Sequence, residues 1–351
     1  MTTIKSDIII IGGGLTGLAI AYFLKKKNLK INILEARPRL GGRIFTKYNE
    51  NTTSQEMGAT WLGRKHKDLI DLLKKLNIGV FEQKLGERAI YEPISTSPHQ
   101  LVTLPPNNDP SFRIQGGSSS LIRALANELD EEHIFTNQIV QSIRKEGEEL
   151  TVLTKTDCFK SSIVISTLPP NLLMKTIKIS PVLPHNLQDI AATTHTWMGE
   201  SIKVGLTYKT PFWKDKYSSG TIVSNIGPIP EMYDHSNYEE TGFGLKGFLN
   251  GSYFSLTKEQ RLEMVLKQLQ KYFGEQVRDF VSYEETVWRK EPFTFVNYNT
   301  HILPHQNNGH SIYRKGYLDG TFFVAGSETA DQFPGYMDGA VRSAKYIAEL
   351  F

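Results

Sequence analysis

The sequence predicts an α/β protein built on a parallel sheet and joined to a second, α+β domain. Three observations predict this architecture. A run of four isoleucines passes through a glycine-rich turn into a helical pattern, a second strand-turn-helix pattern lies near the far end of the chain, and strand-like alternation fills the middle. The 351 residues are enough for about two domains of ordinary size.

Composition excludes several classes of protein. The 40 basic and 37 acidic residues leave a formal charge of +3, which is too balanced to indicate nucleic acid or a membrane surface as a partner. The single cysteine, Cys158, excludes an internal disulfide and a multi-cysteine metal site, and it fits a cytoplasmic location. The nine histidines show no HxH or HExxH spacing, so we expect no metal site.

The first element is a strand over residues 8–11, followed by a helix over residues 15–24. The strand is entirely apolar, which is typical of a strand buried on both faces. Gly12 permits the tight bend between the two, Gly14 lets a pyrophosphate approach the backbone, and Gly17 lets the helix pack on the strand. We expect no membrane anchor here, because glycines interrupt the apolar stretch and it is shorter than the roughly 20 residues that span a bilayer.

The helix start and the next strand complete a Rossmann-type βαβ unit. The N–H groups at Leu15 and Thr16 belong to a free helix N-terminus, where phosphate groups bind. A second strand ends at Glu35, 18 positions after Gly17, where a carboxylate accepts hydrogen bonds from an adenosine ribose. The unit therefore predicts a bound dinucleotide.

A second glycine turn follows the acid and favours FAD as that dinucleotide. Ala36 and Arg37 lead to Gly41, Gly42 and Arg43. A flavin that is held permanently gains from further backbone and guanidinium contacts to its diphosphate, whereas a nicotinamide enzyme needs no such turn. The alternatives at this point are that the arginines are simply solvated or that one of them accepts the phosphate of NADP.

With these motifs in place, the sequence resembles the flavin-containing amine oxidase family over nearly its whole length. Besides the two glycine turns, the resemblance is carried by the segments 55–63, 116–126, 163–170, 322–330 and 334–341. The residue pattern of the segment 322–341 alone, apart from the resemblance, predicts a buried strand, a turn and a helix. These elements would complete the nucleotide-binding domain from the far end of the chain.

The resemblance implies a site that combines both ends of the chain. It implies that residues 58–61 run along the isoalloxazine, that Glu328 contacts a ribityl or phosphate-side hydroxyl, that the Met337 backbone approaches the pyrimidine end, and that Tyr336 faces the substrate. The expected cofactor-binding residues are Gly12, Gly14, Leu15, Thr16, Gly17, Glu35, Ala36, Arg37, Gly41, Gly42, Arg43, Gly58, Ala59, Thr60, Trp61, Val140, Gly326, Ser327, Glu328, Gly335, Tyr336, Met337 and Ala340.

The two predicted domains are interleaved along the chain. Residues 1–78, 114–170 and 321–351 are expected to form the FAD-binding domain, and residues 79–113 and 171–320 a substrate-binding domain that covers the flavin. Within the second domain the pattern predicts a strand over 201–208, a short strand that opens at Gly247, and a helix led by Thr257.

The resemblance also implies the chemistry. A substrate carbon next to an amine nitrogen gives a hydride to flavin N5, the resulting imine is hydrolysed, and O2 reoxidises the flavin to release H2O2. The protein positions the substrate and desolvates it, which favours the neutral amine that can donate a hydride. The expected partners are therefore a small amine and O2, and the oligomeric state is not predicted.

Three departures from the family bear on this expectation. Tyr298 stands at the place of the cysteine that tethers flavin in monoamine oxidases, so FAD should bind non-covalently. Asn299 stands where a second tyrosine is expected opposite Tyr336. No lysine lies in 247–253, where the lysine that holds a water at flavin N5 is expected. Lys246 directly precedes this segment, but the sequence does not determine which face of the strand its side chain lies on.

The expected catalytic residues are Tyr336, Tyr298 and Lys203. Of these, Lys203 matches a lysine found generally in the family. Trp61, Trp288 and Phe295 are further candidates for the substrate wall. Three other functions stay open: an FAD-dependent C–C oxidase or desaturase, similar to protoporphyrinogen oxidases and carotenoid desaturases; a nicotinamide-dependent reductase; and a flavoprotein without catalytic activity.

Overall fold

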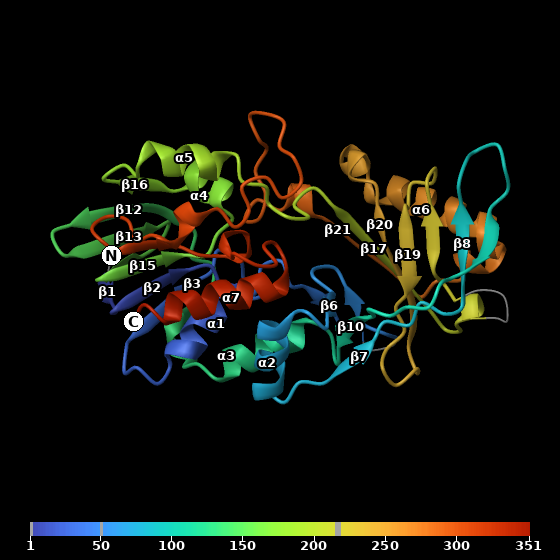
Figure 1. The fold of residues 1–351 in the computed structure, drawn as a ribbon, viewed down its shortest axis with the longest axis horizontal. Helices are drawn as coiled ribbons and strands as arrows, with labels where there is room; N and C mark the ends of the chain where they lie inside the picture. Colours follow the sequence, from blue (N-terminus) through green and yellow to red (C-terminus); the bar gives the residue numbers. More distant parts are fainter. Residues whose placement is uncertain (1–2, 50–51, 215–218) are drawn as a thin grey trace.

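A five-stranded parallel sheet gathers strands from the beginning, middle and end of the chain (Figure 1). The computed structural model describes residues 3–49, 52–214 and 219–351. The order of the strands in this sheet is β11 (Ile134–Phe135), β3 (Ile31–Leu34), β2 (Ile8–Ile11), β15 (Ile163–Ser166) and β22 (Phe322–Val324). All neighbours are parallel. The predicted N-terminal strand and the predicted C-terminal strand are thus separated only by β15.

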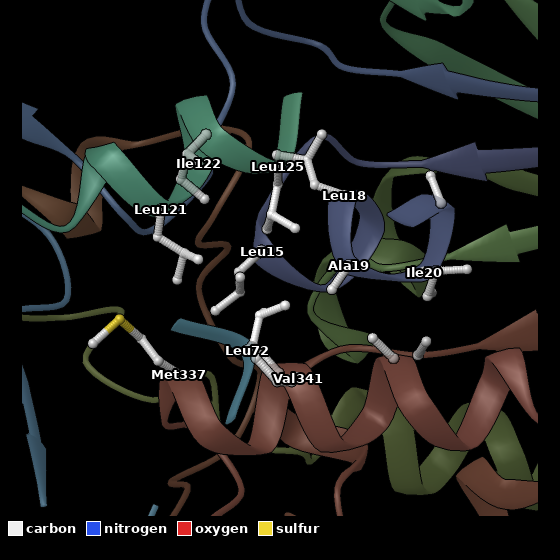
Figure 2. Close-up of a cluster of buried hydrophobic side chains, with 14 of the residues drawn as sticks. Leu15, Leu18, Ala19, Ile20, Leu72, Leu121, Ile122, Leu125, Met337 and Val341 are labelled. Carbon is white, nitrogen blue, oxygen red and sulfur yellow. The ribbon is translucent and has the colours of Figure 1, made fainter. Parts of the chain in front are cut away.

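Helices cover one face of this sheet. They are α1 (Leu15–Leu24), α2 (Lys67–Lys75), α3 (Ser119–Asn127) and α7 (Met337–Ala348). Figure 2 shows side chains of α1, α3 and α7 converging on one apolar cluster, with Leu18, Ile122 and Val341 among them. Because β2 is apolar at every position and lies between this cluster and a second one on its other face, all four of its residues are buried.

A second sheet covers the opposite face. Its strand order is β1 (Thr3–Lys5), β14 (Cys158–Ser161), β13 (Glu149–Thr154), β12 (Val140–Glu146) and β16 (Lys178–Ser180). Two further helices belong to the same layer, α4 (Pro170–Thr176) and α5 (His185–Ala192), and apolar residues of both join the cluster between the two sheets. Together these layers form the predicted Rossmann-type domain.

The other half of the molecule is built on a seven-stranded sheet with α6 (Lys258–Phe273) on one face (Figure 1). Its order is β21 (Ser282–Val287), β17 (Ile202–Tyr208), β20 (Phe243–Leu249), β19 (Glu231–Asp234), β18 (Ile222–Ser224), β8 (Arg88–Glu92) and β9 (Gln100–Thr103). The predicted strand over 201–208 and the helix led by Thr257 are confirmed. The predicted strand start at Gly247 is wrong, because β20 begins four residues earlier, at Phe243.

The remaining elements are short strands and 3₁₀ turns. The strands are β6 (Trp61–Gly63), β10 (Ser111–Ile114) and β7 (Val80–Glu82) in one sheet, and β4 (Thr46–Lys47) with β5 (Gln55–Glu56) in a hairpin. The 3₁₀ turns are η1 (Glu131–His133), η2 (Phe212–Lys214), η3 (Gly251–Ser255), η4 (Glu275–Arg278), η5 (Trp288–Lys290), η6 (Ser311–Arg314) and η7 (Ser327–Thr329).

The segment that contains α4, β16 and α5 packs against the first domain, although the prediction assigns it to the second. The prediction assigns residues 171–320 to the second domain. However, β16 pairs with β12 of the nucleotide domain, and residues of α4, α5 and η6 pack into the cluster beneath it. We therefore propose that the main boundary lies near Thr193 rather than at Asn171, and that residues around η6 belong with the first domain.

Candidate active site

One cavity of about 780 Å³ lies where the two halves of the molecule meet. It is lined by both glycine turns, by the segment 58–61, by the C-terminal turn and by β17. The predicted site residues that line it are Gly12, Gly14, Leu15, Thr16, Glu35, Ala36, Arg37, Gly41, Gly42, Arg43, Gly58, Ala59, Thr60, Trp61, Val140, Lys203, Ser327, Gly335, Tyr336, Met337 and Ala340. Residues from both ends of the chain therefore share one cavity.

The first glycine turn has the geometry that its sequence predicts. Gly12 has a φ of +108°, which a residue with a side chain rarely adopts. Gly17 does not line the cavity. It lies behind the turn, where a Cβ would collide with the Gly12 carbonyl oxygen, so its role is to let α1 approach β2. Gly14 is the N-cap of α1, and no side chain caps the N–H groups at this end of the helix. Leu15 and Thr16, in the first turn of α1, line the cavity.

The two glycine turns lie side by side and form one backbone surface of the cavity. Gly14 and Gly41 form a short parallel bridge, the Gly41 N–H donates to the Gly13 carbonyl oxygen at 2.8 Å, and a Cβ at Gly42 would approach the Gly14 Cα to 3.4 Å. Gly14, Gly41 and Gly42 all line the cavity without a side chain. This surface lies beside the positive end of the α1 dipole, where a diphosphate is expected.

Glu35 is buried at one end of the cavity. Its Oε2 accepts the Gly13 N–H at 2.8 Å and its Oε1 accepts the Arg37 N–H at 2.9 Å. The Arg37 guanidinium turns away toward the second domain, where it donates to Glu291 at 3.0 Å and to the Thr294 hydroxyl at 2.9 Å. Arg37 thus joins the two halves of the protein at the end of the cavity where the ribose of a dinucleotide is expected.

Arg43 and Glu328 connect the second glycine turn to the C-terminal turn. Two guanidinium nitrogens donate to the two carboxylate oxygens, at 2.5 and 2.8 Å, and the Arg43 guanidinium also donates to the Ser327 hydroxyl at 2.8 Å. Burial alone raises the pKa of Glu328, but the Arg43 charge and the hydrogen bonds outweigh it and hold the pKa below its ordinary value. Glu328 is therefore ionised and lies directly behind the cavity wall, as does Gly326, since neither lines the cavity.

The aromatic residues around Tyr336 differ from those expected. Tyr336 is 39% exposed and lines the cavity. Its ring lies 5.8 Å from the Trp197 ring at an interplanar angle of 32°, and the Trp197 ring stacks on His305 at 4.0 Å. Gly335 allows this arrangement, because a Cβ there would meet the Trp197 side chain at 2.6 Å. Trp197, which the sequence analysis did not identify, thus stands beside Tyr336.

Tyr298 is not part of the cavity wall. Its hydroxyl accepts the Thr196 N–H at 2.7 Å, and its ring packs edge-on against Phe295. The neighbouring Asn299 is exposed and accepts a hydrogen bond from Lys175 at 3.1 Å, pointing away from the site. We correct the catalytic assignment of Tyr298 accordingly: it holds the backbone next to Trp197 and does not face the cavity. Trp288 does line the cavity, with its indole N–H on the Met57 carbonyl oxygen.

One wall of the cavity comes from one face of the seven-stranded sheet. Lys203 on β17 lies opposite Phe248 on β20, and Phe248 lies opposite Glu231 on β19. All three line the cavity together with Trp61. Glu231 and Phe248 carry no motif that singles them out, and only the strand register reveals that they share a face with Lys203.

Lys203 is the basic residue of this wall. It is 5% exposed, and its Nζ donates to the Gly58 carbonyl oxygen and, at 3.2 Å, to the Thr60 hydroxyl. The Trp61 and Phe248 rings lie 5.5 and 4.9 Å from this nitrogen. Burial lowers the pKa of Lys203 to about 8. A substantial fraction of the amine is thus neutral near physiological pH, when its lone pair can accept a proton.

The part of the chain that the structure describes contains neither a candidate metal site nor a candidate membrane-spanning helix. No group of three or more His, Cys, Asp or Glu side chains is placed to hold a metal ion within 3–49, 52–214 and 219–351. Across the same residues, no helix has both the length and the apolar character that crossing a bilayer requires. Cys158 lies on β14, outside the cavity lining, which agrees with a flavin that has no cysteinyl bond.

Comparison with known proteins identifies the family. The model of the flavin containing amine oxidoreductases matches residues 15–97 and 99–350. Amine oxidase [flavin-containing] B of Mus musculus is 24% identical over 98% of this chain and 85% of its own, and a probable flavin-containing monoamine oxidase A of Dictyostelium discoideum is 24% identical over 98% and 96%.

Solved structures have the same fold. Wild-type putrescine oxidase bound to putrescine superposes with a TM-score of 0.86 at 23% identity, covering 99% of both chains. Cyclohexylamine oxidase from Brevibacterium oxydans superposes with a TM-score of 0.85 at 18% identity over 98% of both. With a family match over nearly its whole length and a cavity that fits FAD, the chain belongs to the flavin-containing amine oxidoreductases.

Proposed function

We propose that this protein oxidises a small amine with FAD and O2. When bound, FAD would accept a hydride, which carries two electrons, from the carbon next to the amine nitrogen, and O2 would then take two electrons and two protons to give H2O2. The observation that carries the proposal is the position of Lys203, a buried amine on the same cavity as the glycine turns and the C-terminal turn. The FAD contacts are assigned to the cavity-lining residues described above.

Lys203 would make the substrate reactive. An alkylamine arrives in water as an ammonium, which cannot donate a hydride from its neighbouring carbon until it loses a proton. A neutral Lys203 accepts that proton, leaving a neutral amine in the cavity and a lysine ammonium held by the Gly58 carbonyl oxygen and the Thr60 hydroxyl. Trp61, Phe248 and Tyr336 supply aromatic surface that excludes water and contacts the carbon chain.

Glu231 indicates which amines fit. Its carboxylate lines the cavity beside Lys203 and accepts the Tyr233 hydroxyl at 2.8 Å, and its charge raises the pKa of Lys203 against the larger effect of burial. A second ammonium on the substrate would find its counter-charge there. The putrescine bound to a structural relative is a diamine of this kind. We therefore propose short diamines as preferred substrates over monoamines of equal length.

The direct test is anaerobic reduction of the purified yellow protein. We expect the flavin absorption near ~450 nm to bleach with an alkylamine or diamine, and we expect peroxide to form one-for-one with amine consumed when air is admitted. Bleaching by an unsaturated hydrocarbon or a porphyrinogen, with none by any amine, would establish a C–C oxidase instead. A protein that holds FAD but reacts with neither would be a flavoprotein without catalytic activity.

Two smaller proposals accompany this function. We propose that FAD is held non-covalently, so acid precipitation should release all yellow colour into the supernatant, and colour left on the precipitate would contradict it. We also propose a cytoplasmic location, which rests on the single cysteine and the balanced charge. Fractionation of cells that express the tagged chain tests the location.

A further inference from the structure

A second lysine lies directly behind Lys203 and has no part in the mechanism above. Lys246 on β20 is completely buried and does not line the cavity. Its Nζ contacts the Thr60 hydroxyl and lies 4.3 Å from the centre of the Trp61 ring. It forms no ion pair with a carboxylate of the described residues, and the charge of Glu56 raises its pKa against the larger effect of burial. A buried ammonium without a counter-ion is costly, so this residue needs an explanation.

The strand register brings the two lysines to one hydroxyl group. Lys246 lies opposite Gly205 and Phe248 opposite Lys203, so both lysines point from the same face of the sheet. Each lysine donates to the Thr60 Oγ1, and the Thr60 hydroxyl donates in turn to the Gly58 carbonyl oxygen at 3.1 Å. The result is a continuous chain of polar atoms from the cavity into the interior: Lys203 Nζ, Thr60 Oγ1 and Lys246 Nζ.

The carboxylates near these three polar atoms do not supply enough negative charge to balance an ammonium ion on both lysines. Glu56 on β5 is buried, its Oε1 is occupied by the Ser118 N–H and the Thr46 hydroxyl, and its Oε2 has no partner among the described residues. Burial raises the pKa of Glu56, and the positive charge shared by the lysine pair, together with the hydrogen bonds from Ser118 and Thr46, offsets this only in part. Glu231 acts on Lys203 from the cavity side.

The other titratable residues near the lysine pair, Arg113 and His235, supply no negative charge, so a positive charge on both lysines is unfavourable. Burial lowers the pKa of Arg113 only to about 10, so this guanidinium stays charged. His235 is buried, and burial with the nearby positive charges holds its pKa well below the ordinary value, so it is neutral. For Lys246 itself, burial and the Lys203 charge place the pKa well below the ordinary value. The lysine pair therefore carries one proton at most near neutral pH.

We propose that Lys203, the Thr60 hydroxyl and Lys246 form a buried proton relay that holds a single proton, with Lys246 as its interior, neutral member. The proposal rests on the assigned role of Lys203 in amine oxidation. In the relay, Lys203 takes a proton from the substrate ammonium. It can then give one to Thr60 Oγ1 as the Thr60 hydroxyl turns from the Gly58 carbonyl oxygen and gives its own proton to Lys246. One N–H and one O–H bond break and one of each forms, and no net charge is created.

The hydrogen bonds decide where the proton rests. Lys203 has two oxygen acceptors, the Gly58 carbonyl and the Thr60 hydroxyl, whereas Lys246 has only the hydroxyl among the described residues. The proton therefore resides mainly on Lys203. In the structure the Thr60 hydroxyl donates to the Gly58 carbonyl oxygen and accepts from Lys246. When that hydroxyl rotates toward a neutral Lys246, the amine accepts its proton, and Thr60 becomes a better acceptor for the Lys203 ammonium. Lys246 thus acts through Lys203, as a positioning residue.

The test measures the titration of Lys203 in the FAD-loaded protein. We would record ¹³Cε lysine NMR spectra across pH for the wild type and Lys246→Met, with Lys203→Met to assign the signal. Because the variant loses the group that supports the Lys203 proton, we expect the Lys203 midpoint to fall by roughly 1 pH unit below its wild-type value. Thr60→Val should shift it in the same direction, and the exposed control Lys5→Met should not shift it.

The outcomes separate this inference from the proposed function. An unchanged Lys203 midpoint in Lys246→Met, or a rise, overturns the relay, since a rise would mean that Lys246 is charged in the wild type. If amines bleach the flavin, the acid limb of the pH profile for reduction should move with the NMR midpoint, and an acid limb that stays fixed also counts against the relay. If the midpoint falls but no amine bleaches the flavin, the relay stands and amine oxidation fails. Should Lys246→Met not fold with FAD, Lys246→Gln repeats the measurement.

Discussion

The two ends of the cavity are built in different ways. The end that we expect to hold the nucleotide, called the nucleotide end below, is formed by backbone: glycines at Gly12, Gly14 and Gly42, a helix N-terminus, and one acid that accepts backbone N–H groups. The end that we expect to hold the substrate, called the substrate end below, is formed by side chains such as Lys203 and Glu231 that project from neighbouring strands. The first end is therefore defined by local sequence, and the second by the register of a sheet. Variants at each end should fail in correspondingly different ways.

The largest effect is expected at the substrate end. Lys203→Met should lower kcat/KM for an amine by about 10³-fold, because a proton acceptor in the transition state contributes in this range. FAD content should be unchanged. In the wild type, kcat/KM should rise as the pH increases through about 8, since only the neutral form of Lys203 accepts the substrate proton. Steady-state peroxide assays across pH measure both, and a variant with full activity would remove Lys203 from the mechanism.

The next effect concerns the link between the ends of the chain. Arg43→Met leaves the buried Glu328 carboxylate without its partner and should lower the free energy of unfolding by about 3 kcal/mol. Arg43→Met combined with Glu328→Gln should recover part of the loss. Because the folded pKa of Glu328 is depressed, the stability it contributes is present above its ordinary pKa and is lost as the pH falls through the folded value. Urea unfolding at pH 7 and pH 4 checks this, and equal losses at both would contradict it.

A pair of glycine variants separates cofactor binding from folding. At Gly14 a Cβ meets no atom closer than 3.9 Å, so Gly14→Val should fold but cover the backbone surface where the diphosphate is expected, weakening FAD binding by about 100-fold, or 2.7 kcal/mol. At Gly17 a Cβ collides with the Gly12 carbonyl oxygen, so Gly17→Val should lower the melting temperature of the apoprotein itself. Flavin fluorescence titration and thermal unfolding distinguish the two. Similar behaviour of both variants would show that this surface does not hold the diphosphate.

The smallest effect tests substrate preference. Glu231→Gln should lower kcat/KM for a short diamine by roughly 30-fold, or about 2 kcal/mol, because the second ammonium loses its counter-charge. The monoamine of equal chain length should change by less than about 3-fold. A matched loss for both amines would instead assign Glu231 to general cavity structure. The comparison uses one variant and two substrates, so it does not depend on absolute activity.

The same contrast explains what the sequence could predict. The first strand, glycine turn and helix lie where the sequence predicts them, since Gly12, Gly14 and Glu35 occupy fixed offsets around one strand-turn-helix unit. Their contacts with FAD stay a prediction. The start of α6 was also predictable, because Thr257 and Gln260 form a capping box within four residues of each other. Such features depend on contacts between residues close in sequence.

The substrate end depends on contacts that no short segment contains. The start of β20 was misplaced by four residues, which left the orientation of Lys246 unassigned, and a one-residue change in register moves a side chain to the other face of a sheet. Trp197 and Tyr298 illustrate the same limit. Tyr298 lies in a segment that resembles the family, yet its hydroxyl is used by the Thr196 backbone, and Trp197 takes the place beside Tyr336.

The pairing of Arg43 with Glu328 has a consequence for how the protein is made. Translation delivers the first glycine turn long before β22 and Glu328, because α2 to α6 and the seven-stranded sheet lie between them in the sequence. Until then the nascent polypeptide lacks one edge of its central sheet and the partner of a guanidinium that faces the future flavin. Loading of the coenzyme should therefore be a late, post-synthetic event, and incomplete products of the ribosome should be colourless.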